Sequence, residues 1–115
     1  MNPRIKANWI AALRSGKYRR TTHSLRDQRP GKHIGYCCLG VLCDTLKEEL
    51  KGKWDITRAF NYHINNEAHC ITGTLGDNLA KYVELTPRSE ATLIKMNDKE
   101  ELSFKEIADY IEYHL

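Results

Sequence analysis

The residues best suited to chemistry form a basic segment near the start of the chain, from Lys17 to Lys32. This segment holds six lysine or arginine side chains and one tyrosine. An arginine guanidinium offers a planar fork of donors that matches phosphate oxygens, and a tyrosine ring can stack on a base. We therefore predict an anion site for a nucleotide, a nucleic acid strand or an acidic protein surface. The predicted binding residues are Lys17, Tyr18, Arg19, Arg20, Arg26, Arg29 and Lys32.

Charge is distributed unevenly along the chain. Residues 1–36 carry nine Lys or Arg against one acid, whereas residues 89–115 carry three Lys against seven acids. Such asymmetry marks either a partner-binding face or two ends of one chain that attract each other. The second interpretation makes the basic segment a solvated loop, partly neutralised by the acidic C-terminal helix. The formal net charge of +3 is smaller than a dedicated binder of duplex DNA usually carries.

A second kind of chemistry would use Cys38 as a nucleophile. Cys38 lies where a central helix should begin, and the N-terminus of a helix lowers the pKa of a thiol. His63 or His69 would then act as the base, with Asp44 or Asn66 orienting it, as a cysteine hydrolase requires. The apolar neighbours of Cys38 favour burial, which raises the pKa of a thiol and makes it inert. A small cysteine-dependent hydrolase is therefore kept as an alternative function.

The cysteines and histidines lack the spacing of a zinc site. Neighbouring side chains diverge on a strand or a helix, and no pair of cysteines has the two-residue gap of a zinc knuckle. We expect free thiols, no metal and no cofactor. The residues concerned are Cys37, Cys38, Cys43 and Cys70, with His33, His63 and His69.

The chain shows no signal for export or membrane insertion. No apolar run approaches the ~18 residues of a membrane span, and the N-terminus lacks the apolar core of a secretory signal. We therefore expect a cytoplasmic protein whose cysteines are reduced.

Other functional motifs are missing from the sequence. The segment from Ser103 to Leu115 begins like a helix that precedes a DNA-recognition helix, but no recognition helix follows. Its acids Glu106, Asp109 and Glu112 would also repel phosphate. There is no glycine-rich phosphate loop, G-x-S-x-G elbow or H-E-x-x-H motif.

The elements that position these residues predict one α+β domain over residues 1–115, with four to five helices packed on a short antiparallel sheet of one or two hairpins. Apolar residues at helical spacing and capping residues mark the helices. We expect a first helix after Asn2-Pro3, and a second that follows a short strand inside the block Gly35–Asp44 and ends at Gly52. Further helices are expected from Thr74 to Leu85, from Thr86-Pro87 to Asn97-Asp98, and after the Ser103 capping box.

Two hairpins are predicted between the helices. Thr22–Arg26 should pair with Ile34–Cys37 around a turn at Arg29–Lys32. Phe60, Tyr62 and Ile64 alternate and should pair with Cys70–Thr72 around a turn at Asn65–Ala68.

Three blocks resemble a group of small proteins encoded by tailed phages and prophages. They are Trp9–Tyr18, the GYCCLGVLCD block at Gly35–Asp44, and Leu93–Asp98 (LIKMND) followed by Ser103–Glu112 (SFKEIADYIE). The resemblance implies a phage accessory protein that acts in the bacterial cytoplasm by binding and blocking a host component, such as a defence protein. It implies no catalytic residues.

The sequence thus predicts a binding protein more readily than an enzyme. Its partner is a host protein or an anionic ligand, and replacing Arg19 and Arg20 by Glu should abolish binding without unfolding the protein. A structural or oligomerising protein is a further alternative, which an exposed apolar strip from Trp54 to Ile64 would favour.

Overall fold

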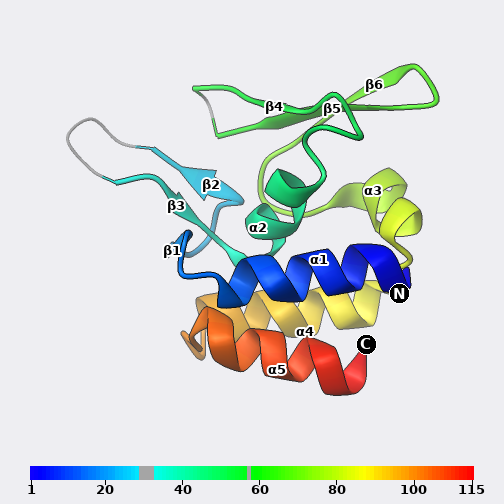
Figure 1. Ribbon diagram of the computed structural model, residues 1–115. Coiled ribbons are helices and arrows are strands. Elements are labelled where there is room, and N and C mark those ends of the chain that lie inside the picture. Colours follow the sequence, from blue (N-terminus) through cyan, green and yellow to red (C-terminus); the bar gives the residue numbers. More distant parts are fainter. Residues whose placement is uncertain (29–32, 57) are drawn as a thin grey trace.

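The computed structural model describes residues 1–28, 33–56 and 58–115, which form five helices and six strands (Figure 1). The helices are α1 (Pro3–Arg14), α2 (Cys38–Thr45), α3 (Gly76–Val83), α4 (Pro87–Asp98) and α5 (Phe104–His114). The strands are β1 (Arg19–Arg20), β2 (Arg26–Asp27), β3 (Gly35–Tyr36), β4 (Lys53–Trp54), β5 (Phe60–Ile64) and β6 (Glu67–Ile71). The predicted α+β domain is confirmed.

Three helices are capped by the residues that the sequence predicts. The Asn2 side chain accepts a hydrogen bond from the Ile5 amide at the start of α1, and Thr86 caps α4 in the same way. At α5, Ser103 Oγ accepts from the Glu106 amide, and Glu106 Oε1 accepts from the Ser103 amide. Each contact satisfies an amide at a helix N-terminus that has no partner inside the helix.

The central helix α2 is shorter than predicted. It ends at Thr45, and hydrogen-bonded turns replace the helix before Gly52. The turns bring Gly52 against the Phe60 ring, where a Cβ atom would lie 2.4 Å from Phe60 Cζ. Leu46 and Leu50 remain buried, so the apolar pattern identifies the core correctly although the helix stops early.

The first sheet has the strand order β1-β3-β2. Strands β2 and β3 pair antiparallel with Arg26 opposite Tyr36, so the predicted pairing is present, but its first strand is Arg26–Asp27 rather than Thr22–Arg26. Strand β1 pairs parallel to β3, with Arg19 opposite Gly35, and was not predicted. A strand of two residues is too short to show any periodicity. The predicted turn at Arg29–Lys32 lies outside the described residues.

The second sheet has the order β4-β5-β6 and contains the second predicted hairpin. Asn65 and Asn66 both adopt left-handed backbone conformations, with φ of 52° and 67°. Two such residues are typical of a tight type I′ turn, so β6 already begins at Glu67. Strand β4 pairs with β5 and was not predicted.

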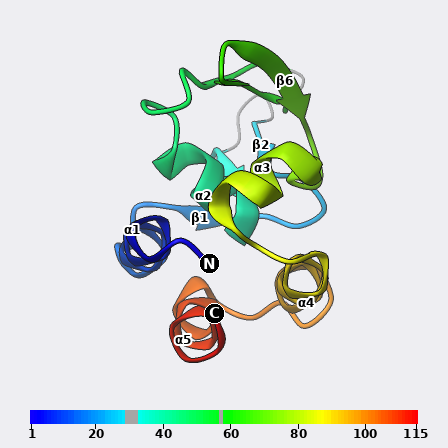
Figure 2. The ribbon, with the colours of Figure 1, turned by 90° about the vertical axis from the view of Figure 1, so that its right-hand side faces the viewer.

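Helix α2 lies at the centre of one core, between the second sheet and the three longer helices. Figure 2 shows α1, α4 and α5 end-on beneath α2 and α3. Trp9 of α1 is fully buried and donates through Nε1 to the Cys38 carbonyl at 2.9 Å. No helix among residues 1–28, 33–56 and 58–115 is long and apolar enough to cross a membrane.

Ion pairs connect the first helix, α1, with the last helix, α5. Arg14 of α1 contacts Asp109 at 2.7 Å and Glu112 at 3.1 Å, both on α5. The opposite charges at the two ends of the chain therefore do attract each other, through Arg14 and, at the longer distance of 3.9 Å, through Arg20 of the basic segment and Glu101.

Candidate anion-binding surface

The best-defined cation of the basic segment is Arg26. Its guanidinium carbon lies 5.8 Å from the centre of the Tyr36 ring and 5.6 Å from that of Trp54. Its Nε also donates to the Tyr36 hydroxyl at 3.4 Å. All three side chains are half-buried, and no carboxylate of the described residues pairs with Arg26. The protein thus holds an uncompensated positive charge against an aromatic surface.

An aromatic row fixes this surface. Tyr18 packs edge-on against Tyr36 at 5.0 Å, and Tyr36 packs against Trp54 at 5.9 Å. Beneath the row, Asp44 accepts from the Tyr18 hydroxyl at 2.6 Å and from Trp54 Nε1 at 3.0 Å. Because Tyr18 is held on both sides, it supports the surface rather than offering a free ring.

The same contacts perturb both titratable partners. Burial raises the pKa of Tyr18, and the carboxylate of Asp44 raises it further. Burial alone would raise the pKa of Asp44, but hydrogen bonds from Tyr18 and Trp54 outweigh it and keep that pKa below its ordinary value. Asp44 therefore stays ionised at neutral pH and stabilises the folded state, an effect that is lost as the pH falls through its lowered pKa.

The other predicted binding residues divide into three groups. Lys17 and Arg19 are exposed and form no ion pair within the described part of the chain. Arg20 is engaged, because its Nη1 donates to the Asn97 carbonyl at 2.8 Å and its Nη2 lies 3.9 Å from Glu101. Arg29 and Lys32 lie outside the described residues.

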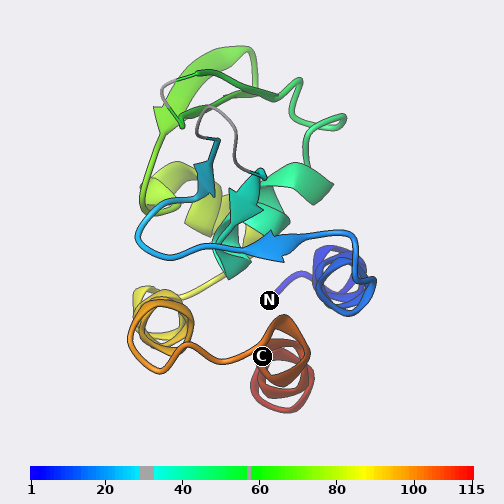
Figure 3. The same ribbon diagram turned by 90° about the vertical axis from the view of Figure 1, so that its left-hand side faces the viewer.

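We use the name basic surface for Arg26 on its two rings together with the exposed cations Lys17 and Arg19 at the start of β1. Strands β1 and β2 flank β3, so the backbones of Arg19 and Arg26 lie about 10 Å apart, the width of two strand spacings. Arg19 is opposite Gly35 and Arg26 is opposite Tyr36, so the two side chains leave opposite faces of this small sheet. Figure 3 views the molecule from the side on which these strands lie.

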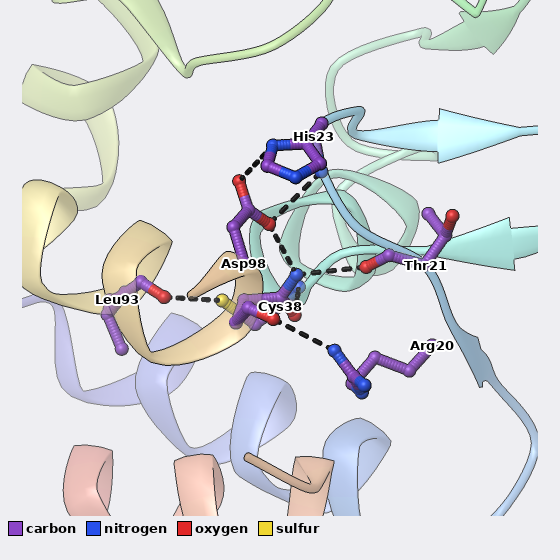
Figure 4. Close-up of polar contacts among 7 residues, drawn as sticks. Arg20, Thr21, His23, Cys38, Leu93 and Asp98 are labelled. Atoms are coloured by element: carbon purple, nitrogen blue, oxygen red, sulfur yellow. Dashed lines mark hydrogen bonds and ion pairs between the residues drawn. The ribbon is translucent and has the colours of Figure 1, made fainter. Parts of the chain in front are cut away.

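A buried hydrogen-bond network anchors the strands behind this surface (Figure 4). Asn97, only 1% exposed, accepts from the Cys38 amide at 3.1 Å and donates to the Thr21 carbonyl at 2.9 Å. Its amide also donates to Asp98 Oδ1 at 2.8 Å. The GYCCLGVLCD block and the LIKMND block therefore meet at Asn97, where they join α2, α4 and β1 to one another.

The residues of the alternative hydrolase are not brought together. Cys38 is fully buried, its thiol donates to the Leu93 carbonyl at 3.7 Å, and burial raises its pKa well above the ordinary value. His63 is exposed on β5, and His69 stacks on Tyr62 at 5.1 Å. The described hydrogen bonds of Cys38 involve no histidine.

The remaining members of the predicted hydrolase and zinc sets have other positions. Asp44 is occupied by Tyr18 and Trp54, and Asn66 lies in the β5–β6 turn. Cys37 caps α2 by accepting from the Gly40 amide at 3.3 Å, and burial raises its pKa to about 11. His33 is exposed. Among the residues that the structure describes, no three His, Cys, Asp or Glu side chains are arranged to hold a metal ion.

One family model spans the domain. The model described as Domain of unknown function (DUF8296) matches residues 1–115. The chain belongs to this family. No curated protein and no solved structure matches the DUF8296 chain. The family match covers all three of the blocks quoted above for their resemblance to phage proteins.

Sequence reasoning missed Tyr36 and Trp54 as parts of the DUF8296 basic surface. The predicted first hairpin could have placed Tyr36 opposite Arg26, since facing residues of an antiparallel pair project on the same side. Nothing in the sequence points to Trp54, which comes from the second sheet and meets Arg26 only through tertiary packing.

We expect one fast-reacting thiol among the four cysteines. Cys70 is exposed, whereas Cys37, Cys38 and Cys43 are buried, and burial raises the pKa of each of the three. A thiol-reactive chromogenic disulfide at neutral pH should therefore label one equivalent quickly and the other three only in denaturant. The Cys70→Ser variant should lose the fast phase. A second fast equivalent would mean that the α2 thiols are accessible.

Proposed function

We propose that this DUF8296 protein is a phage accessory protein that binds an anionic ligand or an acidic face of a host component through its basic surface. The phage setting is supported by the GYCCLGVLCD and LIKMND…SFKEIADYIE blocks, which resemble proteins of tailed phages and prophages. The observation that carries the binding role is the position of Arg26 on Tyr36 and Trp54 without a carboxylate partner in the described structure.

The physical reason is preorganisation. A surface arginine that is free in solution loses side-chain entropy when it binds an anion. Arg26 is already restrained by two rings and by the Tyr36 hydroxyl, so less entropy is left to lose. Exposed Lys17 and Arg19, at and just before β1 on the other side of β3, add long-range attraction that falls with salt.

The two alternatives have less support. A hydrolase would need a thiolate, and the buried Cys38 thiol is held protonated. An oligomerising protein would need an exposed apolar strip between Trp54 and Ile64. In that strip Phe60 and Tyr62 are buried, and Ile56, at 99% exposure, is the large apolar side chain that protrudes.

We expect the double variant Lys17→Glu/Arg19→Glu to fold normally and to lose anion binding. Both side chains are exposed and form no ion pair in the described structure, so their replacement leaves the fold contacts intact. Arg20 is unsuitable for this test, because it holds the Asn97 carbonyl. The measurement is the salt concentration that elutes the protein from immobilised heparin, together with the anisotropy of a fluorescein-labelled single-stranded oligonucleotide.

The control is Lys95→Glu/Lys99→Glu, which changes the net charge equally on an exposed part of α4 and its C-cap. Reversing two charges near Arg26 should weaken oligonucleotide binding about a hundredfold at low salt, and the control should weaken it only slightly. Equal losses in both variants would show that net charge alone attracts the probe, and the proposal would then be wrong.

A further inference from the structure

A small polar cavity lies at the end of β6, beside the loop that leads into β2. Its volume is about 390 Å³, within the range of small-molecule sites. It is lined by His23, Ser24, Arg58, Thr72 and Gly73. The lining thus combines a guanidinium, an imidazole and two hydroxyl groups, and no carboxylate of the described residues is part of it.

Each of the two basic side chains contacts a carboxylate: His23 contacts Asp98, and Arg58 contacts Asp27. Asp98 Oδ1 accepts from the His23 amide at 3.1 Å, and Asp98 Oδ2 lies 3.5 Å from His23 Nδ1 (Figure 4). Asp27 Oδ1 lies 3.5 Å from Arg58 Nε. The side chains of Asp27 and Asp98 are only 13% and 14% exposed. Each carboxylate therefore orients its partner from the protein side and leaves His23 Nε2 and the outer nitrogens of Arg58 for a ligand.

The backbone at both basic residues is unusual. His23 has φ of 66° and Arg58 has φ of 71°, in the left-handed region that non-glycine residues rarely adopt. The two residues come from different loops, one before β2 and one before β5, and meet at the same cavity. The fold thus brings two basic side chains to one cavity at the cost of two unfavourable backbone conformations.

We propose that this cavity binds the phosphate group of a small phosphomonoester. A tetrahedral phosphate has three terminal oxygens that can accept from Arg58, from the hydroxyls of Ser24 and Thr72, and from Nε2 of His23 when its imidazole is protonated. A planar carboxylate offers two oxygens and uses fewer of these donors. Because Asp27 and Asp98 lie against the two basic side chains, the site carries little net positive charge, and recognition depends on directional hydrogen bonds. This site is independent of the basic surface and does not rest on its proposed role.

The test is a titration of the ¹⁵N-labelled protein with inorganic phosphate, followed by NMR. Saturable shifts are expected at the Gly73 amide and the Arg58 side chain, with a dissociation constant on the order of 1 mM for the bare ion. The Trp54 indole signal reports the basic surface separately. Acetate should shift the same signals about tenfold more weakly, and a phosphomonoester such as phosphoserine should bind more tightly than phosphate if the cavity accepts the attached group.

Three variants separate the site from general charge effects. Arg58→Gln should weaken phosphate binding about tenfold, and Arg58→Lys, which keeps the charge near Asp27 but loses the fork, should weaken it by a similar factor. Arg88→Gln, on the exposed start of α4, should have no effect. His23→Asn, which tolerates the left-handed backbone, should weaken binding several-fold. Shifts that do not saturate, or an Arg58→Lys variant that binds like the wild type, would overturn the proposal.

Discussion

Replacing Asn97 by Ala should lower the free energy of unfolding by about 4 kcal/mol. The Asn97 side chain makes three hydrogen bonds at a position that is 1% exposed. Its removal leaves the Cys38 amide and the Thr21 carbonyl without their partner inside the protein, and each unsatisfied buried group costs about 1–3 kcal/mol. A site that joins two helices and a strand has little freedom to rearrange around the loss.

The measurement is urea unfolding followed by fluorescence, with Asn8→Ala as the control. Asn8 lies on the exposed side of α1, so its replacement should change the free energy of unfolding by less than about 0.5 kcal/mol. Asn97→Asp should also destabilise, because the carboxylate keeps an acceptor for the Cys38 amide but loses both donors and lies beside Asp98. A loss below about 1 kcal/mol for Asn97→Ala would show that water or local rearrangement replaces the network.

Gly40→Ala should be about as damaging, with an expected loss of about 3 kcal/mol or more. A Cβ atom at Gly40 would lie 1.8 Å from the Leu25 carbonyl oxygen and 2.7 Å from its carbonyl carbon. That carbonyl also accepts from the Cys37 amide, so it cannot move away without breaking the link between α2 and the segment before β2. Alanine gains about 1 kcal/mol over glycine inside a helix, and the steric clash must outweigh this gain.

Gly73→Ala is the matched control for this substitution. No atom lies within 4 Å of a Cβ built at Gly73, so this variant should be as stable as the wild type or slightly more stable. Thermal unfolding of both variants by circular dichroism gives the comparison. If Gly40→Ala melted at the same temperature as Gly73→Ala, the close approach of α2 and Leu25 would not be a feature of the folded protein.

Local signals predicted those elements whose residues interact with near neighbours in the sequence. The Ser103–Glu106 capping box and the Asn65-Asn66 turn each involve residues at most three positions apart, and both are present. Strands β1 and β4 could not be predicted, because two residues show no pattern and pairing depends on a distant strand. The turns that replace the predicted end of α2 place Gly52 against the Phe60 ring, a contact that only the folded chain makes.

The same distinction separates the predicted binding residues. Lys17 and Arg19 are exposed, as expected of cations in a polar stretch. Arg20 and Tyr18 have the same local character, yet they bind Asn97 and Asp44, which lie 77 and 26 positions further along the chain. No local property of the sequence distinguishes a cation held by a distant carbonyl from one that faces solvent. Which part of the basic segment is available was therefore a question that required the fold.

The pairing of Arg14 with Asp109 and Glu112 has a consequence for biosynthesis. On the ribosome, α1 is made first, yet the helix against which it packs is formed by Phe104–His114. The apolar side of α1, including Ile10 and Leu13, therefore has to wait for almost the whole domain to emerge before it is covered. A nascent chain of this kind exposes part of its apolar surface until the last helix has emerged, which favours aggregation of incomplete chains.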